Sequence, residues 1–245
     1  PPPPPPPHGD IVRVFKGHDD VVNSVAFSPD RVLAASGSAD GKINVWNMST
    51  GELTQKIKAH KQGVLKVAFS PDGKLILSGG IKKGKGKDKK KNTYPIKLWD
   101  VATGKPLAKT NLAEHKEALL IALFSPNGRY VLSGDRSGTS TPNATLKLWD
   151  TEAPEIVLPK GIAAPPKEPV RIFEGHAGAI LTAAFSPDGT RVLAGGDGTL
   201  TIWETETGKR LGGGSDPGQT NRPVGSSEEP PPAGGVPPET EKPRG

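Results

Sequence analysis

Residues 17–46 read GHDDVVNSVAFSPDRVLAASGSADGKINVW, and this stretch decides the fold. It holds a histidine near its start, a phenylalanine nine residues later and a tryptophan at its end. Two apolar segments, VNSVAF and RVLAAS, are rich enough in β-favouring residues to be short strands. The Ser-Pro-Asp sequence between them supplies turn chemistry, because proline fixes φ. The stretch therefore predicts short antiparallel strands rather than a helix.

The same anchors recur four times along the chain. Each histidine precedes its phenylalanine by nine residues, and each phenylalanine opens an FSPD or FSPN turn. The repeats end in NVWN (44–47), KLWD (97–100), KLWD (147–150) and TIWE (201–204). Anchors that recur in one order identify an internal repeat of short strands. The histidines are His18, His60, His115 and His176, the phenylalanines are Phe27, Phe69, Phe124 and Phe185, and the tryptophans are Trp46, Trp99, Trp149 and Trp203.

The Gly-His pairs at 17–18 and 175–176, together with the Trp-Asp endings, resemble the WD-repeat family of β-propellers. The resemblance covers roughly residues 11–211. It implies an all-β fold, a propeller-type array of four blades of four short antiparallel strands, with an open or incomplete ring among the expected forms. In such blades the outermost strand precedes the histidine and the other three follow it. Ser-Pro-Asp-Gly repeats beside proline-rich segments also resemble bacterial members of the family.

Composition separates the two ends of the chain from its middle. Residues 1–10 begin with seven prolines, and residues 212–245 contain almost no large apolar residue. Neither end can bury enough surface to offset the entropy of ordering, so we expect both to be disordered. Residues 11–211 form the expected propeller domain. We expect its repeats to span about 11–52, 53–105, 106–169 and 170–211.

The sequence contains no pattern that predicts catalysis. Four of the five histidines are repeat anchors, and the fifth, His8, lies in the proline-rich arm. There is no cysteine nucleophile, and the HExxH, GxxxxGKS/T and GxSxG patterns do not occur. We therefore predict a non-enzymatic protein with no cofactor and no metal site. No apolar run approaches the roughly 20 residues that a membrane-spanning helix needs. The cytoplasm is the default compartment, and export stays open because the chain begins with proline rather than methionine.

The family resemblance gives the histidines a structural role. It implies that each His joins a second-strand Ser or Thr, an Asp in the following turn and the Trp in a hydrogen-bond network. The first repeat matches fully. In the third repeat Asn143 has the spacing of the Asp, and in the fourth Gly195 stands where the hydroxyl belongs. The predicted network residues are His18, Ser36, Asp40 and Trp46; His60, Ser78 and Trp99; His115, Ser133, Asn143 and Trp149; and His176, Asp197 and Trp203.

Insertions mark where function is expected. The tryptophan follows the histidine by 28 and 27 residues in the first and last repeats, but by 39 and 34 in the second and third. The extra length falls in two loops, 81–94 and 135–144, which the resemblance places on one rim of the propeller. A third insertion, 151–169, should emerge on the opposite face. Because loops carry function more readily than scaffold strands, we predict a scaffold that binds protein partners through this rim.

Two alternatives remain open. Residues 82–91 contain seven lysines and one aspartate, a charge of +6 that equals the net charge of the whole chain. This loop is either a solvated insertion or a weak, nonspecific contact for polyanions such as nucleic acid. The other alternative is a regulatory or docking module of a larger enzyme, which rests on family analogy. The candidate polyanion contacts are Lys82, Lys83, Lys85, Lys87, Lys89, Lys90 and Lys91.

The ends of the array raise the question of ring closure. The segment IVRVF (11–15) has the position of an outermost strand with no repeat before it. After Leu211 the chain runs into glycines, so the last blade is predicted to lack its outer strand. Four blades would each have to turn about 90°, against about 51° for the seven blades that are usual. Three forms remain open: an open array, two chains that associate to complete a ring, and a fragment of a longer array.

Overall fold

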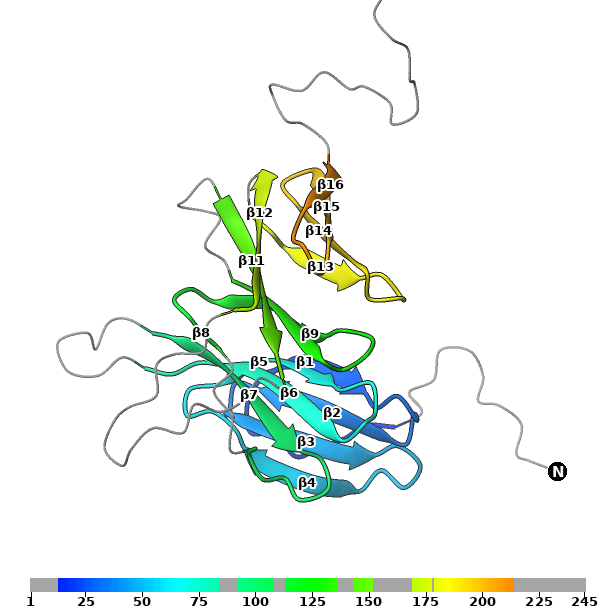
Figure 1. Cartoon of the computed structure of the whole chain (residues 1–245). Coiled ribbons are helices and arrows are strands. Elements are labelled where there is room, and N and C mark those ends of the chain that lie inside the picture. The colour runs from blue at the N-terminus through cyan, green and yellow to red at the C-terminus, as the bar shows by residue number, and fades with distance from the viewer. Residues whose placement is uncertain are drawn as a thin grey trace, which may run out of the picture. The chain divides into compact units, whose positions relative to one another are not determined.

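A computed structural model describes residues 13–83, 92–107, 113–135, 143–151, 169–177 and 179–213 (Figure 1). The described residues form four antiparallel sheets, each of four strands in chain order. The first sheet contains β1 (Val22–Phe27), β2 (Leu33–Ser38), β3 (Lys42–Asn47) and β4 (Leu53–Lys58), and the second contains β5 (Val64–Phe69), β6 (Leu75–Gly80), β7 (Tyr94–Asp100) and β8 (Ala113–His115). The third contains β9 (Leu119–Phe124), β10 (Tyr130–Asp135), β11 (Asn143–Asp150) and β12 (Arg171–Ala177), and the fourth contains β13 (Thr182–Phe185), β14 (Arg191–Gly196), β15 (Thr199–Glu204) and β16 (Arg210–Gly213).

Each of the first three sheets takes its last strand from the segment before the next histidine. β4 ends two residues before His60, β8 ends at His115, and β12 contains His176. The sheet is therefore offset from the sequence repeat by one strand, as the family resemblance implies. The predicted all-β array of four-stranded blades is confirmed.

The turn after each phenylalanine is held by its serine. In the second sheet the Ser70 hydroxyl accepts a hydrogen bond from Leu75 N (2.9 Å) and lies 2.6 Å from Asp72 Oδ1. Gly73 adopts a φ of +72°, a conformation that favours glycine. The first repeat lacks this glycine, and Arg31 takes a φ of +63° in its place. The tight turn explains why the spacing between the serine and the following strand is the same in all four repeats.

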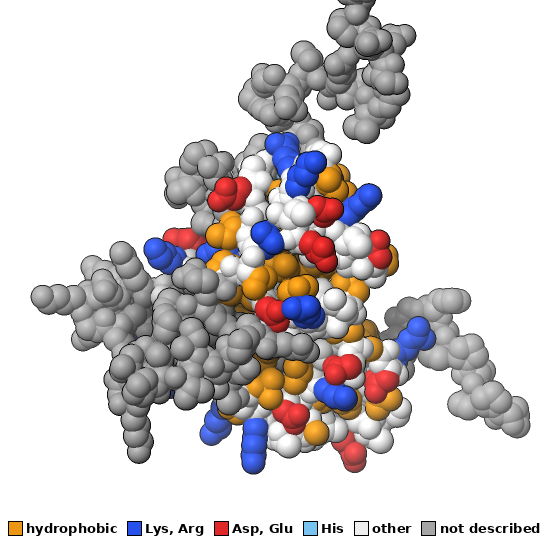
Figure 2. All heavy atoms as spheres, in the orientation of Figure 1, with side chains coloured by type: hydrophobic (Ala, Val, Ile, Leu, Met, Phe, Trp, Pro, Cys, Tyr) orange, Lys and Arg blue, Asp and Glu red, His pale blue; other side chains and the backbone are white. Residues whose placement is uncertain are grey.

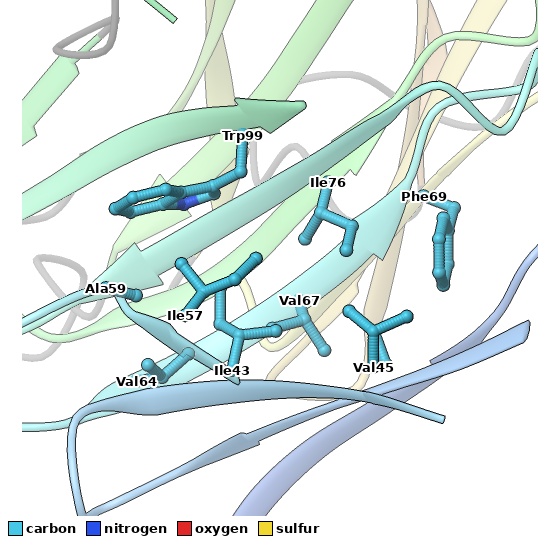
Figure 3. Packing of buried hydrophobic residues seen from close by; sticks show 10 residues of the cluster. Ile43, Val45, Ile57, Ala59, Val64, Val67, Phe69, Ile76 and Trp99 are labelled. Atoms are coloured by element: carbon cyan, nitrogen blue, oxygen red, sulfur yellow. The ribbon is translucent and has the colours of Figure 1, made fainter. Parts of the chain in front are cut away.

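Neighbouring sheets pack face to face through apolar side chains. Figure 3 shows the junction of the first two sheets, where Val64 and Val67 point toward Ile43 and Val45. Both faces of β3 are buried, as expected for a strand covered on both sides. The cluster at this junction consists of Ala35, Ile43, Val45, Ile57, Ala59, Val64, Val67, Phe69, Ile76 and Trp99.

Two expectations about the ends of the array are wrong in the described residues. Residues 13–21 form no strand, although IVRVF was expected to be one. The ring of Phe15 instead packs edge-on against the Trp46 ring, with 5.4 Å between the two ring centres. β16 supplies the outer strand that the last sheet was expected to lack, and it extends to Gly213, beyond the expected domain end. Pairing uses backbone groups, so glycines can extend a sheet wherever an edge such as that of β15 is open.

The expected disordered ends cannot be compared with the fold. Residues 1–10 and 214–245 lie outside the described residues, and so do 84–91, 136–142 and 152–168 within the three insertions. The repeat bounds remain predictions.

The packing between sheets predicts unequal tolerance of two glycines. A Cβ on Gly37 would lie 2.6 Å from Val64 Cγ1 and 2.8 Å from Val67 Cγ1, both buried β-branched side chains. At the matching position of the last sheet, a Cβ on Gly195 would meet only the exposed Leu200 closely, at 3.0 Å. Gly37→Ala should therefore lower the free energy of unfolding by about 1–3 kcal/mol. Gly195→Ala should change it by less than about 0.5 kcal/mol. Urea denaturation measures both, and equal losses would contradict the packing.

Candidate functional site

In the first sheet one hydroxyl joins a histidine to a tryptophan. His18 Nε2 lies 2.7 Å from Ser36 Oγ, and Trp46 Nε1 donates to the same oxygen at 2.9 Å. His18 Nδ1 lies 3.1 Å from Asp40 Oδ2. Asp40 also accepts the backbone N–H groups of Asp19 and Lys42. The network links the segment before β1 to strands β2 and β3.

The order Asp–His–Ser is that of a hydrolase triad, but the hydroxyl here is already occupied. With Nδ1–H donating to Asp40, His18 Nε2 is the acceptor for the Ser36 hydroxyl proton, a tautomer that the hydrogen bonds imply. The Ser36 oxygen in turn accepts the Trp46 indole N–H. Ser36 and its counterparts Ser78 and Ser133 are buried. A nucleophile must reach its substrate, so this geometry suits packing better than chemistry.

The second and third sheets repeat the arrangement. His60 Nε2 lies 2.8 Å from Ser78 Oγ, which also accepts Trp99 Nε1–H at 2.8 Å. In the third sheet His115 Nε2 lies 2.8 Å from Ser133 Oγ, and Trp149 Nε1 donates to the same oxygen at 2.7 Å. The structure therefore brings together the predicted His, Ser and Trp of all three sheets. That they serve only the fold remains a prediction.

The acidic partner in the third sheet was misassigned. His115 Nδ1 lies 2.9 Å from Asp135 Oδ2, where the spacing to the tryptophan had pointed to Asn143. Asn143 begins β11, and its side chain lies outside the described residues. The tryptophan is a poor reference because the insertion separates it from the second strand. Counting four residues from Ser133, the spacing from Ser36 to Asp40, would have led to Ser137 and also missed Asp135.

In the fourth sheet the histidine has other hydrogen-bond partners than predicted. Ala194, and not Gly195, holds the register position of the serine, opposite Ala183 of β13. His176 Nδ1 instead bonds Thr201 Oγ1 at 2.9 Å, and its Nε2 lies 3.4 Å from Thr199 Oγ1. The two threonines of β15 were missed because the search for a hydroxyl was confined to the second strand.

The other two predicted members of the fourth network have backbone partners. Asp197 Oδ2 accepts the N–H of Ala179 at 2.6 Å, and Asp197 itself has a φ of +46°. Trp203 Nε1 donates to the carbonyl of Glu174 at 2.9 Å. The structure thus keeps these side chains near the histidine segment without joining them through one hydroxyl.

Burial and hydrogen bonds set the charges in these networks. Burial lowers the pKa of His60 to about 3, and the charge of Lys97 adds to the effect. Burial alone would raise the pKa of Asp40, but the N–H groups of Asp19 and Lys42 and the His18 imidazole outweigh it and lower it to about 2. Burial also lowers the pKa of His176. At neutral pH the structure therefore favours a neutral His60 in the second sheet and an ionised Asp40 in the first.

The stems of the two predicted rim loops lie beside histidines. Lys82 and Thr93 exchange backbone hydrogen bonds of 2.8 Å and close the stem of the first loop. A Cβ on Gly80, two residues before this stem, would overlap the His60 ring. Asp135, which bonds His115, is the last described residue before the second loop. Both loops therefore leave neighbouring sheets at the same end, the end that carries the histidines.

Only part of the lysine-rich loop can be placed. Lys82 and Lys83 are described, whereas Lys85, Lys87, Lys89, Lys90 and Lys91 lie outside the described residues. Lys97 Nζ donates to the carbonyl of Ala59 at 3.0 Å and lies 5.6 Å from the ring centre of Trp99. Burial, followed by the charge of Lys82, lowers the pKa of Lys97. Positive charge therefore gathers at the stem of this loop.

The described residues contain no cluster of three or more His, Asp or Glu side chains that could hold a metal ion. A search of the same residues for a helix long and apolar enough to cross a membrane also finds none.

The repeats have relatives among known proteins. A sequence model described as WD domain, G-beta repeat, matches residues 9–47, 51–88, 105–150 and 167–204, which make up more than half of the chain. The chain belongs to the WD-repeat family. Each matched segment contains one of the anchor histidines, and all but the second also contain the tryptophan of their repeat, because Trp99 lies outside residues 51–88.

Three relatives show how much of a WD-repeat protein this chain represents. The guanine nucleotide-binding protein subunit beta of Arabidopsis thaliana is 27% identical, covering 81% of this chain and 60% of that protein. The nuclear distribution protein PAC1 of Arthroderma otae is 30% identical over 77% of this chain and 37% of that protein. Actin-interacting protein 1 of Drosophila melanogaster is 32% identical over 40% of this chain and 14% of that protein. The chain spans less than two thirds of each relative. These relatives come from a plant, a fungus and an insect, so they do not support the bacterial resemblance.

The shared hydroxyl predicts a large cost for a small substitution. Ser78→Ala would leave the Trp99 N–H and one His60 nitrogen buried without a partner, at a cost of about 1–3 kcal/mol for an unsatisfied buried group. Ser49→Ala, in an exposed turn, should change the free energy of unfolding by less than about 0.5 kcal/mol. Guanidinium denaturation of both variants measures the difference. Comparable stabilities would show that the shared hydroxyl contributes little to the fold.

The low pKa of His60 predicts a loss of stability in acid. An unfolded histidine titrates near 6.5, so below that pH the unfolded chain binds a proton that the folded chain excludes until about pH 3. The His60 contribution to the free energy of unfolding is therefore complete above about pH 6.5 and lost as the pH falls toward about 3. Urea unfolding at about pH 7 and about pH 4.5 should show a larger fall for the natural chain than for His60→Gln. An equal fall in both proteins would rule out His60 as the cause.

Proposed function

We propose that this chain is a non-catalytic scaffold that presents a loop-rimmed propeller surface to protein partners. The observation that supports this most strongly is the position of the loop stems at Lys82–Thr93 and at Asp135. They lie at the histidine end of two neighbouring sheets, so the inserted residues have a rigid base in common. Loops held on a rigid scaffold are the usual place for recognition in such folds.

The hydrogen bonds of the buried histidine and serine side chains support a role without catalysis. The histidine and serine side chains that resemble a hydrolase triad are buried and hydrogen-bonded to each other or to tryptophan. Relatives also bear names that refer to assembly with other proteins: one is a subunit of a guanine nucleotide-binding protein, and another is actin-interacting. Carried over to this chain, such a role is protein binding, with the partner itself unassigned.

Polyanion binding through Lys82–Lys91 is the second candidate function. Lys82 and Lys97 lie close enough that the charge of one lowers the pKa of the other, which favours an anionic contact at the loop stem. Such a contact would be nonspecific, because lysine charge alone carries no sequence recognition. The third candidate, a docking module of a larger enzyme, rests on family analogy alone.

The rim proposal predicts that partner binding depends on two of the three insertions. Replacing residues 84–91 and 136–142 together with short Gly-Asn turns should abolish retention of protein partners in cross-linking pull-downs read by mass spectrometry. Replacing 152–168, which connects β11 to β12 at the opposite end of the strands, is the matched control and should leave retention unchanged. Short turns preserve the strand connections, and unfolding midpoints verify the fold. Partners that survive loss of both rim loops, or substrate turnover by the purified chain, would overturn the proposal.

A further inference from the structure

At the first two junctions between sheets, an aliphatic side chain of one sheet fills the space beside a glycine of the sheet before it. A Cβ on Gly37 would lie 2.6 Å from Val64 Cγ1, and a Cβ on Gly79 would overlap Leu119. Both glycines follow the network serine, and both aliphatic residues stand five residues before the phenylalanine. We name the glycine the socket and the aliphatic residue the plug. At the third junction Ile180 stands at the sequence position of the plug and is buried in a cluster with residues of the third sheet, but a Cβ on Gly134 would meet Leu146 and Ile121 of its own sheet.

Among the residues that the structure describes, no socket receives the plug of the first sheet. Val22 stands five residues before Phe27 and is 47% exposed, whereas its counterpart Val64 is fully buried. Val25 is 73% exposed and its counterpart Val67 only 6%. Phe27 is 68% exposed, whereas the phenylalanines of the second and third repeats are each 8% exposed. Figure 2 shows that hydrophobic side chains are open to solvent on the face in view. An apolar surface of this kind marks an interaction site.

In the described part of the chain, no plug fills the socket of the last sheet. Gly195 holds the position of Gly37, and beside it lies an open hollow of about 410 Å³ lined in part by Leu181 and Leu200. Leu193 and Leu200 are 40% and 59% exposed, while the residues at their register positions in the second and third sheets are fully buried. The space that Val64 and Val67 fill against the first sheet is therefore empty against the fourth.

One of the two polar contacts of the first junction has a counterpart at the ends, whereas Leu181 stands in the last sheet where Asn23 stands in the first. At the first junction Val67 N donates to Ser24 Oγ at 3.1 Å, and Asn23 Nδ2 donates to the carbonyl of Val64 at 2.9 Å. Thr182 in the last sheet holds the place of Ser24, three residues before the phenylalanine, and is exposed. The last sheet thus presents a hydroxyl of the kind that accepts the backbone N–H of an incoming strand.

We propose that the fourth sheet of one copy of this chain binds the first sheet of a second copy, with Val22 of the first sheet seated beside Gly195 of the fourth. The Thr182 hydroxyl would accept the N–H of Val25 across this junction. The occupant is a second copy because the uncovered plug and the uncovered socket are the two halves of the junction that this chain builds twice within itself, with Gly37 and Val64 and with Gly79 and Leu119. This assembly goes beyond the proposed scaffold function and does not depend on it.

The ends also determine the form of the assembly. A plug on one end and a socket on the other make a head-to-tail contact, which generates a ring if its rotation closes. Two copies provide eight sheets, within the range of about 4–8 blades seen in propellers. Each sheet would then turn about 45°, half the angle that one four-sheet chain needs to close alone. Two copies joined by two identical junctions leave neither end uncovered.

Mass in solution tests the assembly directly. The 245-residue chain should run in light scattering at twice its 25.6 kDa mass. Val22→Asp and Gly195→Val should each weaken the dimer at least tenfold, the first by placing a charge in the apolar junction and the second by filling the socket. Val170→Asp, on the outer edge of the third sheet, replaces a valine of nearly the same exposure (46%) and should leave the mass unchanged. Unfolding midpoints show that the variants fold. A mass of one chain, a mass above two chains, or a dimer insensitive to both end substitutions would overturn the proposal.

Disulfide trapping identifies the surfaces in contact, because the chain has no cysteine of its own. At the first junction the Cβ position of Gly37 lies 3.2 Å from Val64 Cβ, close to the roughly 3.5–4.5 Å that separates Cβ atoms in disulfides. The double substitution Val22→Cys/Gly195→Cys should therefore give a covalent dimer under oxidising conditions. Each single substitution serves as the control and should give none. A disulfide within one chain would show that the ends meet each other in a single copy, and the absence of any disulfide would show that they do not meet; either result overturns the proposal.

Discussion

The sheets of this protein are apolar on both faces, so each must be covered on both sides to stay folded in water. Within the array both faces of β3 are covered. On the first and last sheets, the exposed side chains of Val25 and Leu200 mark the faces that no other described sheet covers. A chain of identical units that each need two neighbours always ends in two uncovered faces, unless the ends are capped or joined. The repeat in the sequence and the uncovered ends are therefore two results of one constraint.

The buried histidine networks complement this apolar packing. Apolar faces can slide past each other, whereas a hydroxyl that bonds both His60 and Trp99 fixes one register between the second strand, the third strand and the segment that enters the sheet. The fourth sheet reaches the same end by another route, because Thr201 supplies the hydroxyl that Ala194 lacks. The histidine is hydrogen-bonded in all four repeats, but its hydrogen-bond partner is not the same residue type in each. This is expected because a buried polar group without a partner is costly.

Local patterns predicted the strands well, and long-range partners poorly. β1, β5 and β9 begin and end where the apolar segments before the phenylalanines do, because burial and turn chemistry act within a few residues. The assignment of Asn143 over Asp135 failed because an insertion of unknown shape separates the tryptophan from the second strand. β16 was missed for a different reason: its glycines have low strand propensity, but the edge of β15 supplies the hydrogen bonds. Register and edge pairing are properties of the assembled sheet, and a single segment does not encode them.

The turns after the phenylalanines explain why the chain varies in length where it does. A Cβ on Gly128 would lie 3.5 Å from Pro71 Cδ, and one on Gly189 would lie 3.5 Å from Pro126 Cδ, so the turns of successive sheets stand against one another. An added residue in one turn would displace the next. The loops between second and third strands lie at the opposite end of the strands, away from these turns. Insertions are found instead in the loops at the histidine end and in the connection from β11 to β12, which is not one of these stacked turns. At the histidine end the scaffold can acquire a binding surface without lengthening the turns that stand against one another.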